Sequence, residues 1–147
     1  MIGSLRRVVL TIVALVAAVG AYAAVAGSIV VTSAVLDSST IRVSIAWTAN
    51  ASGAVTENLT PNISGRLFQA KFAPGTGGDA PDAGYDVTLL DGDGVDVLIG
   101  GGANLGAATS TIVQILPPVY LDAQALQPVV ANAGSTNKGT LVLWVQR

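Results

Sequence analysis

The sequence of 147 residues contains no cysteine and no histidine, and only 11% of its residues are charged. Without cysteine no disulfide can form, and without both residue types most nucleophile–base pairs and transition-metal sites are excluded. Basic residues are also few, with seven Lys and Arg against nine Asp and Glu. Binding to nucleic acid requires a basic patch. We therefore expect a protein that is not an enzyme, uses no cofactor and binds no nucleic acid.

The composition of the chain changes near Gly27. Val8 to Ala26 is apolar and free of charge, and Arg6 and Arg7 stand just before it. A short basic region, an apolar core and an A-x-A-like ending are typical of a secretory signal, and a run of about 19 residues also comes close to a bilayer span. We interpret residues 1–26 as a hydrophobic signal-like or anchor-like helix that could contact a membrane through residues 8–26. Alternatively, the natural product begins close to Ala26 or Gly27.

Residues 27–147 have the length of one average folding unit, so a single domain is predicted there. Without Arg6 and Arg7, this part keeps five basic residues against nine acidic ones. A domain of this length with so few charged residues is suited to using part of its surface for contacts with other subunits.

Patterns with a period of two predict strands throughout residues 27–147. The clearest is Thr40 to Thr48, where Ile41, Val43, Ile45 and Trp47 share one face. Further strands are predicted at 28–35, 54–59, 66–73, 85–90, 95–99, 119–121, 126–131 and 138–146. Residues 74–84 are predicted to form an exposed loop without secondary structure, and 103–116 fit helix or strand equally. Roughly eight to ten short strands are typical of an antiparallel β-sandwich or jelly-roll-like domain.

Turn residues predict how two pairs of these strands connect. Asn50 to Gly53 would return 54–59 as the partner of strand 40–48, because Asn and Gly tolerate positive φ. Asp91 to Gly94 would join 85–90 to 95–99 in a second hairpin. Pro117 and Pro118 are predicted to end the segment before them.

The acidic residues around the second turn form the candidate metal site. Asp91, Asp93 and Asp96 could offer carboxylate oxygens to calcium within a Gly-containing turn. An EF-hand loop does not fit, because Val95 stands where a third ligand is needed. The preferred interpretation is a turn that holds no metal.

Several short segments follow one another in a characteristic order. They are Ile45-Ala46-Trp47-Thr48 with Ala51-Ser52-Gly53, Ser64-Gly65-Arg66, Lys71-Phe72 before Pro74-Gly75, Tyr85-Asp86-Val87-Thr88-Leu89 with Asp91 and Gly94-Val95-Asp96-Val97-Leu98, and Val130-Ala131-Asn132-Ala133-Gly134 before Lys138-Gly139-Thr140. In this order they resemble a group of small tailed-bacteriophage proteins, usually labelled as virion structural or hypothetical proteins. The resemblance implies a β-rich, multimeric particle component and assigns no binding residue. Members of the group begin near the first strand, so residues 1–26 are atypical of it.

Three functional hypotheses remain open from the sequence. The first is a non-enzymatic virion structural protein, a capsid decoration or head–tail accessory component that forms homo-oligomers and contacts other virion proteins. The alternative is a secreted or membrane-anchored bacterial surface or filament subunit, or an adhesin-like β-sandwich. The third is a small secreted carbohydrate-binding sandwich that stacks sugars on Trp47, Trp144 or Tyr85. For both tryptophans, packing in the core is the preferred interpretation, because each lies in an alternating run.

Overall fold

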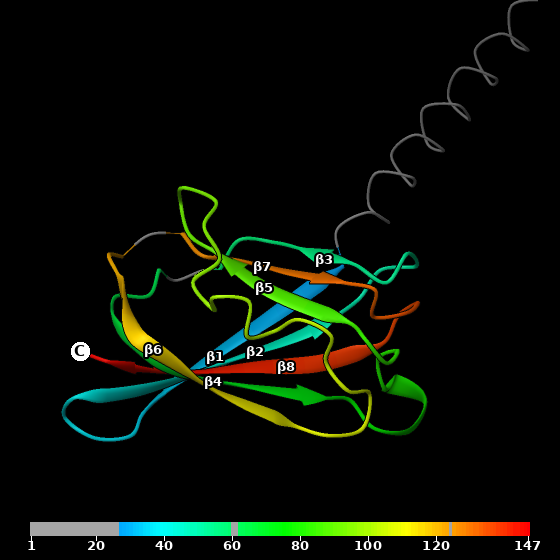
Figure 1. Ribbon diagram of the computed structural model, residues 1–147, viewed down its shortest axis with the longest axis horizontal. Coiled ribbons are helices and arrows are strands. Elements are labelled where there is room, and N and C mark those ends of the chain that lie inside the picture. The colour runs from blue at the N-terminus through cyan, green and yellow to red at the C-terminus, as the bar shows by residue number, and fades with distance from the viewer. Residues whose placement is uncertain (1–26, 60–61, 124) are drawn as a thin grey trace, which may run out of the picture.

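A computed structural model describes residues 27–59, 62–123 and 125–147. These residues form two antiparallel sheets, with strand order β1-β2-β8-β4-β6 in one and β3-β7-β5 in the other (Figure 1). The all-β prediction is therefore confirmed. The predicted N-terminal helix falls on residues 1–26, outside the described residues. Within the described part of the chain, no helix is long and apolar enough to cross a membrane.

The described residues contain eight strands of 2 to 11 residues and a single turn of 3-10 helix. Their bounds are β1 Ser28–Val35, β2 Thr40–Thr48, β3 Val55–Thr56, β4 Gly65–Pro74, β5 Asp86–Leu90, β6 Thr111–Leu121, β7 Gln127–Ala131 and β8 Lys138–Gln146, with the 3-10 turn η1 at Gly77–Asp79. The η1 turn corrects the prediction that 74–84 has no secondary structure.

The core lies between the two sheets, which Figure 1 shows one above the other. The five-stranded sheet contributes the predicted buried face of β2 together with the alternate residues of β8, and the three-stranded sheet contributes residues such as Val87 and Val130. Removing one large aliphatic side chain from water contributes about 1.5–3 kcal/mol, so this single core dominates stability.

Strand β8 is the last in sequence and the middle strand of its sheet. It pairs with β2, placing Leu143 opposite Val43, and with β4, placing Leu143 opposite Ala70. Near the start of β8, Gly139 lies directly beneath the indole of Trp47, where a Cβ would collide with the ring. The absence of a side chain at Gly139 leaves room for the indole of Trp47.

The first predicted hairpin is wrong in its pairing, although its turn forms. Asn50 Oδ1 accepts hydrogen bonds from the N–H groups of Ser52 at 2.8 Å and Ala54 at 3.0 Å, and Gly53 has φ 77°. After this turn, however, β3 crosses to the other sheet and pairs with β7. The physical reason is competition, because β1 and β8 already occupy both edges of β2 along its length.

The strict alternation predicted for residues 66–73 is broken by a bulge. The register of β4 shifts between Leu67 and Gln69, so Leu67, Ala70 and Phe72 are buried together. The neighbouring strand β6 continues through Pro117 and Pro118, which were predicted to end it. The prolines are tolerated because β6 is an edge strand and they lie where its pairing with β4 is interrupted.

Candidate interaction surface

The chain folds back at Asp91 to Gly94 as predicted, but residues 95–99 do not form a strand. The N–H groups of Asp93 and Val95 donate to Asp91 Oδ1 at 3.0 and 2.8 Å, which closes the turn. Only an isolated bridge joins Leu90 to Asp96 beyond it. The second strand is therefore a wrong prediction, and the segment turns again at once.

The carboxylate of Asp96 explains why that second strand does not form. Its Oδ1 accepts hydrogen bonds from the N–H groups of Leu89 at 3.1 Å and Leu98 at 3.0 Å, and its Oδ2 accepts one from Gly100 at 2.9 Å. These three backbone groups are satisfied by one side chain instead of by a neighbouring strand. Asx geometry of this kind competes directly with strand pairing.

The structure does not bring Asp91, Asp93 and Asp96 together as a set of ligands. Asp91 and Asp96 use their oxygens on backbone N–H groups, and Asp93 is exposed. In the part of the chain that the structure describes, no group of three His, Cys, Asp or Glu residues is placed to hold a metal ion.

The two tryptophans occupy different environments. Trp47 is buried and lies 5.8 Å from the ring of Tyr85 at an interplanar angle of 50°, so its predicted role in the core is confirmed. Burial also raises the pKa of Tyr85 above its usual 10.0. Trp144 is half-buried and projects from the opposite side of the sheet, so the same prediction is wrong for Trp144. Of the three residues suggested for sugar stacking, only Trp144 reaches the surface.

Trp144 lies at the centre of a sheet face that no other layer of the described residues covers. In antiparallel pairs, opposite residues project to the same side. Trp144 lies opposite Arg42 on β2 and Gln69 on β4, and Val142 lies opposite Ser44 and Lys71. We call this surface the outer face. Its members are Val30, Thr32, Ala34, Thr40, Arg42, Ser44, Ala46, Arg66, Gln69, Lys71, Ala73, Ile112, Gln114, Tyr120, Lys138, Thr140, Val142, Trp144 and Gln146.

The outer face mixes apolar and cationic groups. Val142 is only 4% exposed although no sheet lies over it, whereas Ile112 is 58% exposed and Tyr120 75% exposed. Arg66 is exposed, and Arg42 and Lys71 are half-buried. A half-buried aromatic ring with flanking arginine and aliphatic groups resembles the composition at the centre of protein interfaces.

One end of the outer face is hollowed. Ala46, Ala73 and Thr140 are small, and together with Val30 and Gly139 they line a pocket with a volume of 400 Å³. Lys138 closes its rim through an ion pair with Asp79 at 3.0 Å. The outer face is thus a concave surface at this end.

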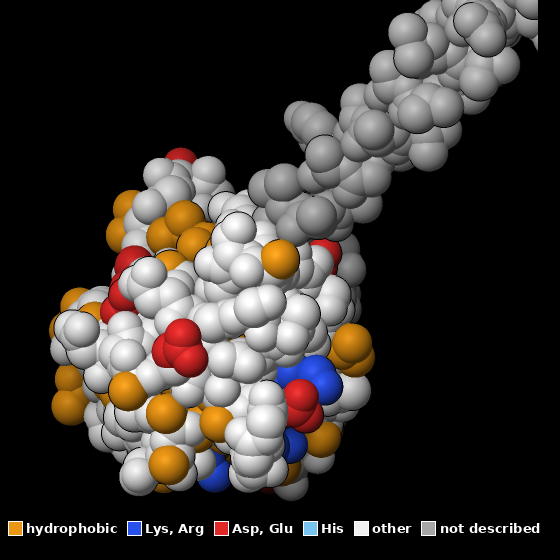
Figure 2. All heavy atoms as spheres, turned by 90° about the vertical axis from the view of Figure 1, so that its right-hand side faces the viewer, with side chains coloured by type: hydrophobic (Ala, Val, Ile, Leu, Met, Phe, Trp, Pro, Cys, Tyr) orange, Lys and Arg blue, Asp and Glu red, His pale blue; other side chains and the backbone are white. Residues whose placement is uncertain are grey.

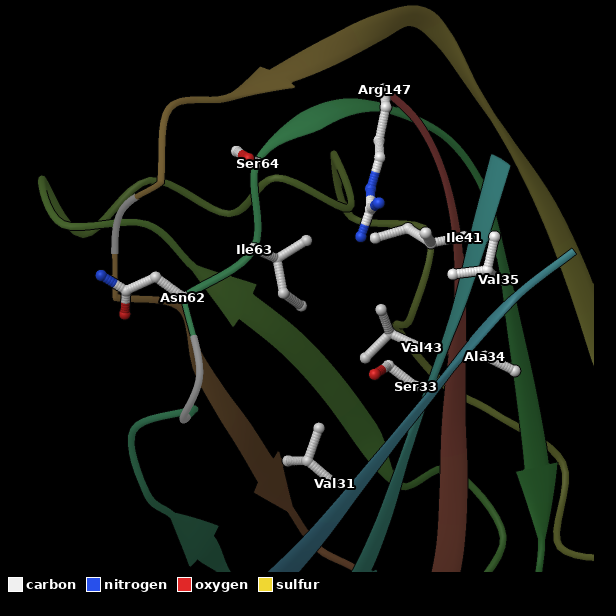
Figure 3. Close-up of a pocket in the computed structure, with 10 residues that line it drawn as sticks. All are labelled: Val31, Ser33, Ala34, Val35, Ile41, Val43, Asn62, Ile63, Ser64 and Arg147. Atoms are coloured by element: carbon white, nitrogen blue, oxygen red, sulfur yellow. The ribbon is translucent and has the colours of Figure 1, made fainter. Parts of the chain in front are cut away.

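A second pocket lies on the other side of the sheet, beneath the free edge formed by β1. Val31, Ile41, Val43 and Ile63 give it an apolar lining and a volume of 160 Å³. In Figure 3 the guanidinium of Arg147 points into this space. The pocket exists because the five-stranded sheet is wider than the sheet facing it, so the edge of β1 is only partly covered.

No protein-family model matches the chain, and neither a curated protein nor a solved structure does.

Sequence reasoning missed the outer face as a surface. The alternation in Thr40 to Thr48 does place Arg42, Ser44 and Ala46 opposite the buried side. The alternation does not show which strands lie next to one another. The strands that align Arg42, Trp144 and Gln69 in one row come from distant parts of the chain.

Proposed function

We propose that the protein is a non-enzymatic structural component of a virus particle, a capsid decoration or head–tail accessory protein. It acts by assembling with copies of itself and with other virion proteins. The proposal includes two further points. The fold is a jelly-roll-like relative of domains that form virus particles, and the protein is located in the virion.

The observation that carries the proposal is the uncovered outer face. A sheet that is apolar and cationic on its solvent side, with Trp144 at its centre, is suited to be covered by another protein surface. Structural proteins repeat such contacts many times, so that individually weak interfaces add up. The resemblance of the segment order to small tailed-phage structural proteins also supports the proposal.

An alternative function is a secreted or membrane-anchored surface or filament subunit of a bacterium. The charge-free run from Val8 to Ala26 behind Arg6 and Arg7 favours it, because such a run directs a chain to a membrane. In this alternative the β-sandwich-like part is displayed outside the cell and residues 8–26 contact the bilayer.

The test is the intact mass of the natural protein, measured separately in purified particles and in membranes of the source. A mass that corresponds to a start near Gly27, found in particles, is the expected result. Recovery of the protein only from membranes, at full-length mass, would overturn the virion proposal and leave the surface subunit in its place.

A further inference from the structure

Cations are concentrated on the outer face and have few acidic partners there. Of the five basic residues after Gly27, only Arg147 lies elsewhere. Lys138 is paired with Asp79, whereas Arg42, Arg66 and Lys71 have no acidic oxygen of the described residues within ion-pair distance. Three positive charges therefore face solvent around Trp144 without neutralisation.

Several acidic residues lie on the opposite side of the molecule, whereas Asp79 lies at the rim of the outer face. Between Lys71 and Lys138 the chain has seven acidic residues and no basic one. Asp86 projects outward from β5, and Asp91 and Asp93 follow in the turn beyond it. In Figure 2 the visible Lys and Arg side chains lie in the lower half, on the side of the five-stranded sheet, while most Asp and Glu side chains lie above them.

The acidic side also has a projecting shape. The segment after β5 rises beyond the three-stranded sheet (Figure 1) and exposes Asp93 between two glycines, with Val95 59% exposed beside it. We call residues 91–95 the acidic tip. The tip is convex, acidic and partly apolar, and the outer face is cationic, partly apolar and hollowed at one end.

We infer that the outer face binds the acidic tip and the adjoining acidic side of a second copy of this chain. The inference rests on the proposed function, because it specifies how the copies of a structural protein would join. The two surfaces lie on opposite sides of one molecule, so each copy has one free surface of each kind after the first contact. Such a heterologous contact continues from copy to copy and produces a ring or a filament.

Apolar contacts and charges play different parts in this interface. Trp144, Ile112 and Val30 supply the surface whose burial drives association. Exposed charge pairs contribute little energy each, but they select the orientation and reject contacts between two basic faces. Association should therefore be specific for the basic-to-acidic orientation and weaken as salt screens the charges.

The experiment uses the full chain in a non-ionic detergent, because residues 8–26 are apolar, and measures association by sedimentation velocity. The face variant carries Arg42→Glu and Lys71→Glu. The tip variant carries Asp93→Lys and Val95→Lys, two exposed positions of the acidic tip whose side chains take no part in the turn hydrogen bonds described above. Arg147→Glu is the matched control, since this substitution reverses the charge of a cation that lies outside the outer face. Circular dichroism and thermal unfolding of each variant check that it folds.

We expect wild-type association to weaken about tenfold or more in either double variant, and also when salt is raised from about 0.05 M to about 0.5 M. Mixing the face and tip variants should restore association, because each then meets a partner of opposite charge. Arg147→Glu should associate as the wild type does. Restoration on mixing also excludes misfolding as the cause of the loss in each variant alone.

Two results would overturn the inference. One is association of both variants at wild-type strength, which would place the contact elsewhere. The other is loss in both variants without restoration on mixing, which would indicate a contact between like faces or a partner other than this chain. In either case, recovery of the protein in multimeric form from particles would leave the proposed function standing, so the two failures are distinguishable.

Discussion

The two faces of the five-stranded sheet are built from the same strands but obey different rules. On the inner face, Ile45 and Leu143 are completely buried, and the opposing sheet covers them. On the outer face, Val142 is buried almost as well, although no other layer of the described residues covers it. Two adjacent residues of β8 therefore lie in different environments, Leu143 in the packed interior and Val142 on the solvent-facing side.

This difference teaches that low exposure alone does not define a core. A residue held between two layers leaves a cavity when it is truncated, because atoms on both sides are fixed. Truncation of a residue that is shielded only by long surface side chains costs less, because those side chains can move into the space that is left. Stability should be set by the inner face and association by the outer face.

The largest effect is expected at the inner face. Leu143→Ala should lower the free energy of unfolding by about 3 kcal/mol, since it opens a cavity between the sheets. Val142→Ala, one residue away on the outer face, should cost roughly half of that or less. Urea unfolding monitored by circular dichroism measures both. Equal costs would break the distinction between the two faces.

A methyl group added to the inner face should also be harmful. Gly139→Ala would place a Cβ against the indole of Trp47, and overpacking of this kind costs about 1–3 kcal/mol. Gly106→Ala is the control, because nothing lies near a Cβ at that position. Thermal unfolding together with near-ultraviolet circular dichroism of the tryptophans reports both stability and ring position. An unchanged Trp47 signal with unchanged stability would contradict the packing described.

Removal of the Asp96 side chain, which takes the place of a neighbouring strand as hydrogen-bond acceptor, should have an intermediate effect on the free energy of unfolding. Asp96→Ala deprives the N–H groups of Leu89, Leu98 and Gly100 of their acceptor, which should cost about 1–3 kcal/mol. Asp93→Ala removes an exposed carboxylate from the same turn and should change stability by less than about 0.5 kcal/mol. Urea unfolding of the pair distinguishes a structural carboxylate from a surface one. A similar cost for both would mean that the turn does not depend on Asp96.

Substitution of a cation on the outer face should scarcely affect stability. Lys71→Gln should change the free energy of unfolding by less than about 0.5 kcal/mol, because Lys71 has no ion pair among the described residues. The same change should weaken association measured by sedimentation velocity. A large loss of stability without a change in association would reverse the roles assigned to the two faces.

The smallest effect is expected in the turn between β1 and β2, and it disappears at acid pH. The Ser39 N–H and hydroxyl and the Thr40 N–H donate to Asp37 Oδ1, and these bonds lower the pKa of Asp37 below 3.8. Because the folded pKa is lowered, the stabilisation is present above pH 3.8 and is lost as pH falls through the folded value. The midpoint of thermal unfolding of Asp37→Ala should therefore lie below that of the wild type at neutral pH and approach it in acid. A difference that persists unchanged at low pH would contradict this.

Local patterns predicted much of the fold. Ser28–Val35, Thr40–Thr48 and the last strand, 138–146, were predicted at the bounds observed, because each alternates or is β-branched along its whole length. The inward side of β2 was also predicted residue by residue.

Pairing could not be predicted, because it depends on competition between distant strands. Residues 54–59 were assigned to β2 by the turn chemistry of Asn50 and Gly53, but β8 pairs along the whole of β2 instead. Similarly, Asp96 diverts 95–99 from strand pairing through bonds that no period reveals. The outer face follows from pairing and was therefore beyond sequence reasoning as well.

The position of β8 has a consequence for how the protein is made. A ribosome makes β1, β2, β4 and β6 before β8, yet β8 must enter between β2 and β4 to join the pairs β1-β2 and β4-β6 into one sheet. Until then, β2 and β4 each offer an unpaired edge, the kind of surface that templates misassembly. Completion of the sheet therefore waits until β8 has been made, and a premature stop codon before residue 138 leaves two half-sheets in place of a shortened protein.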